Sequence, residues 1–308
     1  MSLHTIEFEK LRLVPGDRLL DLGCGEGRHA ITAYTLAPIE SVGIDLSVRD
    51  LNTTRERFEQ FRIEDDDSRS LVISVASGLG LPFADNTFDK VICAEVLEHI
   101  DDYRSVVKEI HRVLKPGGIF GMSVPRFFPE WVCWRLSDAY HEVEGGHVRI
   151  FNANHLREDV EKAGFVRFDK HHAHSLHVPY WWLKCLFWRD EGEEAAPVRY
   201  YHRFLVWDLM SRPRLTQWLD KILNPLMGKS VVMYFVKQAP RPETPRDRQA
   251  VRFRRIVPRG VFLGDGGLYR RRPAKRWRHP VVRVRSAGSL GPCRGRNGPD
   301  HWGPLRRG

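Results

Sequence analysis

The sequence Leu-Leu-Asp-Leu-Gly-Cys-Gly-Glu-Gly-Arg-His occupies residues 19–29 and decides the fold, because it places an apolar strand directly before three glycines. Without side chains, Gly23 and Gly25 let the backbone turn sharply and approach a ligand at the start of the following helix. A second apolar run, Val-Gly-Ile-Asp-Leu-Ser at 42–47, ends in Asp45, whose carboxylate can accept both hydroxyls of a ribose. Together the two segments predict a nucleotide-sized pocket.

Apolar runs alternate with helical patterns along the first part of the chain, which predicts an α/β doubly wound sheet with helices on both faces. Strands are expected at 18–22, 41–45, 71–75, 90–94, 119–124, 165–170 and 230–237. Helices are expected at 28–36, 48–61, 102–114 and 154–163, the last of them closed by a glycine. The core of such a domain lies between the sheet and these helices.

Dinucleotide-binding proteins also place glycines before a helix, but with the spacing Gly-x-Gly-x-x-Gly. Here the spacing is Gly-x-Gly-x-Gly with Asp21 just ahead, an arrangement that resembles the class I S-adenosylmethionine-dependent methyltransferases, in particular the methyltransferase type 11 and quinone and sterol methyltransferase-like family. Later segments resemble that family in the same order: Leu-Pro-Phe at 81–83, Glu-Val-Leu-Glu-His-Ile at 95–100 and Leu-Lys-Pro-Gly-Gly at 114–118. The resemblance covers about residues 10–237. It implies a Rossmann-like methyltransferase fold, with seven mostly parallel strands of which the last is antiparallel.

The resemblance also implies that S-adenosylmethionine is the cofactor. Asp21 would order the loop and reach the amino group of the methionine part, while Gly23 and Gly25 would pass close to its carboxylate. Asp45 would bind the ribose. The remaining cofactor contacts are expected at Leu46, Ala76, Ser77 and Glu95. Relatives usually carry an acidic residue where this chain has Ser77, so its hydrogen bond to the adenine amino group would be weaker.

Glu95, Glu98 and His99 share one face if a helix begins there, because they are spaced at i, i+3 and i+4. Two carboxylates and an imidazole can hold a divalent cation. The segment resembles Glu-x-x-Glu-His of quinone O-methyltransferases and small-RNA 2′-O-methyltransferases, which bind magnesium with a later histidine, matched here by His147. We therefore expect His99 and His147 to be catalytic, within a Mg²⁺ site of Glu95, Glu98, His99 and His147. The alternative is a metal-free segment that supports the cofactor strand.

Two segments interrupt the alternation, at 125–150 and 174–229, and both are rich in Trp. Ligands bind beyond the carboxyl ends of the strands in an open parallel sheet, so both inserts are predicted to form a substrate lid. Apolar spacing predicts helices at 180–188 and at 200–223, the latter broken by Pro213. A lid or interfacial surface is expected from Trp181, Trp182, Trp188, Trp207 and Trp218. Four histidines at the end of a predicted strand are most simply interpreted as solvent-exposed side chains. They are His171, His172, His174 and His177.

Charge is distributed unevenly along the 308-residue chain, whose net charge is +10. Residues 240–308 contain 19 Lys and Arg against four Asp and Glu, which leaves residues 1–239 near −5. Low hydrophobicity and high charge predict that this basic tail is disordered. Two interpretations of the tail stay open. It binds nucleic acid or anionic lipid, or it is an extension without a role in function. We therefore divide the chain into a methyltransferase domain at 1–239 and a tail at 240–308.

Five cysteines without paired spacing fit a reducing compartment, and no uncharged run approaches the ~20 residues of a membrane span. We expect a soluble cytoplasmic protein, with peripheral contact to a membrane left open. Its reaction would be methyl transfer to a hydroxyl or activated carbon of a small, apolar or lipid-linked acceptor. Two alternatives stay open: an RNA 2′-O-methyltransferase-like enzyme and a nucleotide-binding module without turnover. The negative charge of residues 1–239 disfavours nucleic acid as a partner.

Overall fold

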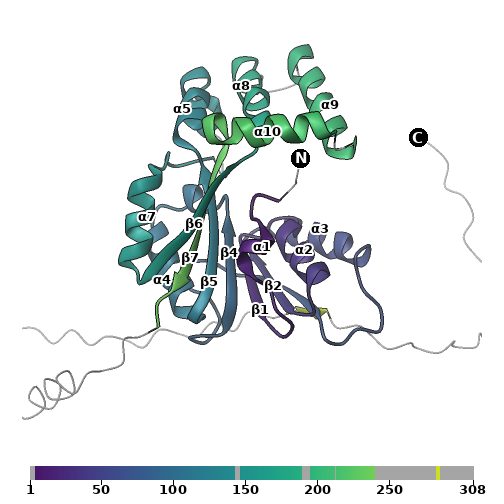
Figure 1. The fold of residues 1–308 in the computed structure, drawn as a ribbon, viewed down its shortest axis with the longest axis vertical. Coiled ribbons are helices and arrows are strands. Elements are labelled where there is room, and N and C mark those ends of the chain that lie inside the picture. Colours follow the sequence, from purple (N-terminus) through teal and green to yellow (C-terminus); the bar gives the residue numbers. More distant parts are fainter. Residues whose placement is uncertain (1–3, 143–145, 189–194, 212, 240–281, 285–308) are drawn as a thin grey trace, which may run out of the picture.

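An eight-stranded sheet runs through the centre of the protein in the order β6-β7-β5-β4-β1-β2-β3-β8 (Figure 1). The computed structural model describes residues 4–142, 146–188, 195–211, 213–239 and 282–284. The strands are β1 (Arg18–Leu22), β2 (Glu40–Asp45), β3 (Ser70–Val75), β4 (Phe88–Ala94), β5 (Leu114–Pro125), β6 (Phe165–Ala173), β7 (Ser230–Lys237) and β8 (Val282–Val284). β1 to β5 pair in parallel, whereas β7 runs antiparallel between β5 and β6. β1 to β7 therefore confirm the expected seven-stranded, mostly parallel arrangement, and β8 adds one strand at its edge.

Helices cover both faces of this sheet (Figure 1). On one side lie α1 (Phe8–Leu11), α2 (Arg28–Leu36) and α3 (Val48–Glu59), and on the other α4 (Tyr103–Val113) and α7 (Ala153–Lys162). Successive strand residues point to opposite faces, which β1 illustrates: Leu19 packs in the cluster of α1 and α2, and Leu20 in the cluster of α4 and α7. The apolar strand thus supplies both halves of the core.

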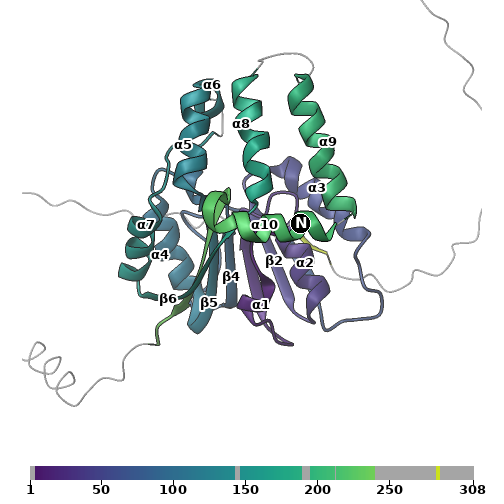
Figure 2. The same cartoon turned by 45° about the horizontal axis from the view of Figure 1, so that its top comes forward.

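The two inserts form a helical lid above one edge of the sheet (Figures 1 and 2). The first insert contains α5 (Phe127–Leu136) and α6 (Ala139–Glu142); the second contains the short helix η2 (Ser175–His177), α8 (Val178–Leu186), α9 (Ala196–Ser211) and α10 (Arg214–Met227). Pro213 separates α9 from α10 as expected and is the N-cap of α10. Buried Cys133 and Cys185 join α5 to α8 in a cluster with Trp134, Trp181, Trp182 and Trp188. The inserts therefore pack on each other.

The expected tail lies outside the described residues except at one place. Val282–Val284 forms β8, which pairs antiparallel with β3. The unpaired edge of β3 offers backbone hydrogen-bonding groups to this short strand. Disorder of the tail stays a prediction, because the rest of it lies outside the described residues. Among the helices that the structure describes, none has the length and apolar character needed to cross a bilayer.

The conformation of Gly23 gives a direct test of the loop. Its φ is +71°, and an added Cβ would lie 2.3 Å from Val96 Cγ2. We expect Gly23→Ala to lower the free energy of unfolding by about 3 kcal/mol or more, from left-handed backbone strain and the clash together. Gly16 is the control, because its φ is +85° but nothing lies within 4 Å of an added Cβ. Gly16→Ala should cost only about 1–2 kcal/mol. Equal losses in urea denaturation would contradict this packing.

Candidate active site

The glycine loop after β1 is held by the end of β2. The Gly23 and Cys24 amides donate to the Ile44 carbonyl at 2.8 and 3.0 Å. One oxygen of the Asp45 carboxylate accepts from the Gly25 amide at 2.8 Å, and the other accepts from the Ser47 amide at 2.8 Å. A carboxylate has about four acceptor positions. Asp45 therefore shapes the loop and retains capacity to accept hydrogen bonds from a ligand.

Asp21 is buried beneath the same loop. Its Oδ2 accepts a hydrogen bond of 3.0 Å from the Ala30 amide in the first turn of α2. The N-cap of α2 is Gly27, which has no side chain to offer, so the Asp21 carboxylate serves the helix terminus instead. Burial raises the pKa of Asp21 to about 7. A cationic ligand group beside it would offset this desolvation and keep the carboxylate charged.

The predicted adenine contacts lie at the open ends of β2 and β3. Leu46 and Ser77 are exposed, as is the neighbouring Leu79. Ala76 is half-buried against the core, and its amide donates to the Asp45 carbonyl at 3.2 Å. The same edge of the sheet therefore presents Asp45 together with two exposed apolar side chains, Leu46 and Leu79.

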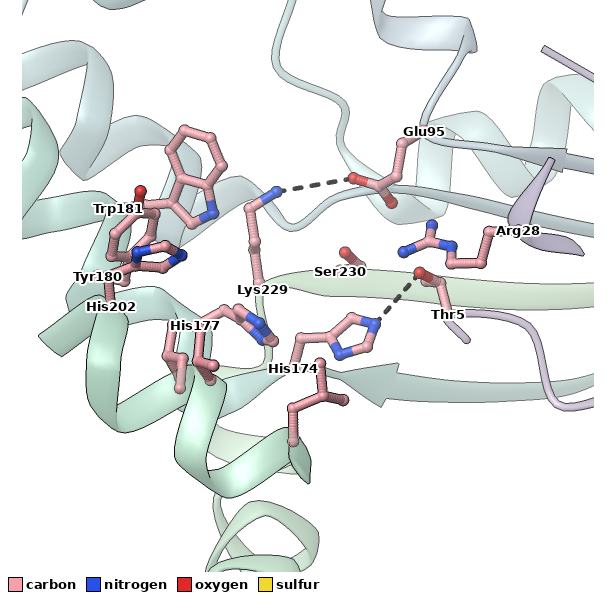
Figure 3. A pocket seen from close by; sticks show the side chains of 13 residues that line it. Thr5, Arg28, Glu95, His174, His177, Tyr180, Trp181, His202, Lys229 and Ser230 are labelled. Atoms are coloured by element: carbon pink, nitrogen blue, oxygen red, sulfur yellow. Dashed lines mark hydrogen bonds and ion pairs between the residues drawn. The ribbon is translucent and has the colours of Figure 1, made fainter. Parts of the chain in front are cut away.

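Glu95, directly after β4, has a left-handed backbone with φ +56°. This conformation is uncommon outside glycine and is concentrated at functional sites. Its amide donates to the Ser123 carbonyl, and the Ser123 hydroxyl donates to Glu95 Oε1 at 2.7 Å. The other carboxylate oxygen lies 3.9 Å from Lys229 Nζ, so the side chain is aimed toward the lid (Figure 3).

A cavity of about 340 Å³ lies between the sheet edge and the lid; we call it the lid cavity (Figure 3). Its polar lining comes from Thr5, Arg28, Glu95, His174, His177, Tyr180, His202, Lys229 and Ser230, and its apolar lining from Trp181, Leu205, Val206 and Leu209. A second cavity, of about 930 Å³, is lined by Gly23, Gly25 and Ala94 among others. Arg28 lines both, so the lid cavity adjoins the glycine loop.

Two histidines in the lid cavity contradict the expectation of solvated strand-end residues. His174 Nε2 is hydrogen-bonded to Thr5 Oγ1 at 3.2 Å, and its ring lies 5.3 Å from the His177 ring. Burial lowers the pKa of His174 to about 3 and that of His177 to about 4. Both imidazoles are therefore neutral near pH 7. His177 Nδ1 is buried without a hydrogen-bond partner among the described residues.

Three of the four predicted metal ligands lie together: Glu98, His99 and His147 each offer an atom within 4.8 Å of the others. Burial, with the charge of Glu95, raises the pKa of Glu98, and neither of its carboxylate oxygens has a partner among the described residues. Glu95 does not join the group, which corrects the predicted set of four. Its left-handed backbone and its contacts to Ser123 and Lys229 turn it into the lid cavity.

The donor chemistry of this group does not match magnesium. Mg²⁺ prefers oxygen ligands in octahedral geometry, whereas two imidazoles and one carboxylate suit transition metals. His147 Nδ1 also donates to Glu130 Oε1, a buried carboxylate that receives hydrogen bonds from Trp134 and Tyr140 as well. Neither His99 nor His147 lines the lid cavity. We therefore assign no step to Mg²⁺ and place the reacting groups elsewhere.

Sequence reasoning missed Arg28, Lys229 and Thr5. A usable signal existed for Lys229: it precedes an antiparallel strand, whose beginning lies at the edge where the parallel strands end. Its ammonium lies 5.1 Å above the Trp181 ring, a cation–π contact that links the sheet edge to α8. Thr5 carried no comparable signal, because nothing in the local pattern brings the first residues to the lid.

Comparison with known proteins identifies the family. A family model described as a methyltransferase domain matches residues 20–122. Demethylmenaquinone methyltransferase of Alkalihalophilus pseudofirmus is 30% identical over 183 residues, which cover 53% of this chain and 75% of that protein. The chain belongs to the S-adenosylmethionine-dependent methyltransferase family.

Two further similarities, one of sequence and one of fold, are consistent with this family. The chain is 36% identical over 155 residues to 27-O-demethylrifamycin SV methyltransferase of Amycolatopsis mediterranei, covering 50% of this chain and 56% of that protein. A crystal structure of a candidate methyltransferase from Bacillus halodurans, 18% identical, shares the fold with a TM-score of 0.52 over 75% of this chain and 97% of its own. The chain spans about half the length of the first curated relatives it matches.

The raised pKa of Asp21 predicts a pH-dependent stability. The unfolded chain releases this proton near pH 3.8, whereas the folded protein retains it to about 7. The contribution of Asp21 to folding therefore becomes less favourable as pH rises through that window. The stability of Asp21→Asn relative to wild type should increase from pH 4 to 7, by on the order of 3–4 kcal/mol.

Asp102→Asn is the control for this measurement. The Asp102 pKa is lowered by hydrogen bonds from Ser105, so the relative stability of this variant should fall slightly over the same range. A relative stability of Asp21→Asn that does not change with pH in urea titrations would contradict the buried, protonated carboxyl.

Proposed function

We propose that the protein transfers the methyl group of S-adenosylmethionine to a hydroxyl or activated carbon of a small, apolar or lipid-linked acceptor held in the lid cavity. The lid cavity itself carries this proposal. It adjoins the glycine loop at Arg28, contains the Glu95 side chain, and is walled on the other side by apolar residues of α8 and α9. The cofactor would bind along the loop and sheet edge, at Asp21, Gly23, Gly25, Asp45, Leu46, Ala76, Ser77 and Glu95.

The chemistry asks little of the protein beyond positioning, because the sulfonium of the cofactor is its own leaving group. The carbon–sulfur bond breaks toward sulfur as the acceptor forms its bond to the methyl carbon. Methylation of a hydroxyl would first give a protonated ether, which is strongly acidic. Even a weak base can therefore take its proton. We assign this role to His177, which lines the lid cavity and whose lowered pKa keeps the imidazole neutral.

Two of the relatives support an apolar acceptor: one is a methyltransferase of demethylmenaquinone and the other of 27-O-demethylrifamycin SV. The four described cysteines are free, which supports a reducing cytoplasm. Nothing in the lining of the described cavities favours RNA as the methyl acceptor. The net charge near −5 of residues 1–239 opposes the binding of RNA, which is a polyanion.

A cavity-filling variant tests this proposal. Val206 lines the lid cavity, so Val206→Trp should fill it and reduce methyl transfer by about tenfold or more while leaving S-adenosylhomocysteine binding unchanged. The measurement is transfer of a labelled methyl group from S-adenosylmethionine to small molecules of a cell extract.

Val166→Trp is the matched control, because Val166 is similarly exposed but lies on β6 outside the lid cavity. It should keep wild-type transfer. Label recovered only in RNA would support the RNA methyltransferase alternative. Cofactor binding with no labelled product would indicate a module without turnover.

A further inference from the structure

Helix α10 carries an apolar stripe that faces solvent. Leu215, Trp218, Ile222 and Leu226 follow one another at intervals of three or four residues, the spacing of one helix face. Their exposed fractions lie between 47% and 71%. A helix of a globular domain normally turns such a stripe toward the core. Here the one buried residue of α10 is Thr216, so the helix is packed through its polar side.

Helix α9 has apolar residues on two sides. Leu205, Val206 and Leu209 line the lid cavity. Tyr200, Trp207 and Met210 are exposed by 50% to 79%, and they precede the exposed apolar residues of α10 along the chain. In Figures 1 and 2, α9 stands at the edge of the lid and α10 lies across its base. We call Tyr200, Trp207, Met210, Leu215, Trp218, Ile222 and Leu226 the α9–α10 face.

The charges of these two helices are sorted by sign. Arg199, Arg203, Arg214 and Lys221 are exposed. The acidic residues turn inward: Asp208 is fully buried, and Asp220 Oδ1 accepts hydrogen bonds from the Ser175 hydroxyl and the Leu176 amide. Every exposed charged residue of α9 and α10 is therefore cationic, on a domain whose net charge is near −5.

We propose that the α9–α10 face docks on an anionic lipid bilayer. Tryptophan, leucine and methionine side chains fringed by arginine and lysine are the composition with which interfacial helices enter the headgroup region. Exposed apolar side chains gathered along a helix in this way mark interaction surfaces. The same helix α9 separates this face from the lid cavity, so an apolar molecule leaving the bilayer crosses one helix to reach it. This inference rests on the surface and holds independently of the reaction.

Charge distinguishes the bilayer from other occupants. A second copy of the chain would set Arg203, Arg214 and Lys221 against the same cations, since a symmetric pair joins like surfaces. Residues 240–308 carry about +15, which also opposes binding to a cationic face. Anionic headgroups are complementary to it, and each exposed Lys or Arg near such a surface contributes about 1 kcal/mol.

Vesicle flotation of the full chain tests the proposal. The probes are vesicles of phosphatidylcholine alone and of phosphatidylcholine with phosphatidylglycerol in equal amounts. Wild type should partition at least about tenfold more strongly to the anionic vesicles, and added salt should weaken this binding. The double variant Trp207→Gln, Trp218→Gln should partition to the anionic vesicles at least about tenfold more weakly than wild type.

The matched control is Leu36→Gln, Phe61→Gln, because both residues are exposed to a similar extent at 59% and 50% but lie far along the chain from the lid. It should bind like wild type. Equal binding of wild type and the Trp207, Trp218 variant would overturn the proposal, because the basic tail alone would then account for attachment. Two further results would overturn it as well. One is absence of vesicle binding by wild type, and the other is a wild-type dimer in sedimentation that dissociates in the Trp207, Trp218 variant and not in the control.

Discussion

The hydrogen bond from the Gly25 amide to the Asp45 carboxylate is the contact on which the site depends, because it joins the ends of two neighbouring parallel strands. The chain must turn sharply after β1. Gly23 has a left-handed backbone with φ +71° and lies against Val96, so no side chain fits there. Asp21 then caps the first turn of α2 from below. Two carboxylates thus fix the loop before any ligand binds, so the loop does not have to be ordered at the moment of binding.

The lid helices cover this edge of the sheet and wall one side of the lid cavity. α5 and α8 come from inserts far apart in the chain and pack through Cys133 and Cys185. Lys229 links them to the sheet, since its ammonium lies between the Glu95 carboxylate and the Trp181 ring. Glu95 has a strained backbone at this point. The cost of that strain is tolerated because Ser123 and Lys229 hold the side chain in the lid cavity.

Much of the fold could be predicted from the sequence, because its signals are local. Leucines before glycines define β1, and Pro213 divides α9 from α10. The Glu98, His99 and His147 group was also predictable. The lid cavity was not, since Thr5, His174 and Lys229 meet only through tertiary packing. The same holds for β8, whose residues pair with β3 although their composition indicates disorder.

Isothermal titration calorimetry of the full chain tests the central claim, that the carboxylate-held loop is an S-adenosylmethionine site. S-adenosylhomocysteine should bind, and Asp45→Asn should weaken its affinity by about tenfold to a hundredfold through loss of charge-assisted hydrogen bonds. Glu40→Gln, at the opposite end of β2 where Glu40 pairs with Arg18, should leave the affinity unchanged. Tighter binding of NAD than of S-adenosylhomocysteine, or an Asp45→Asn variant with wild-type affinity, would contradict the account.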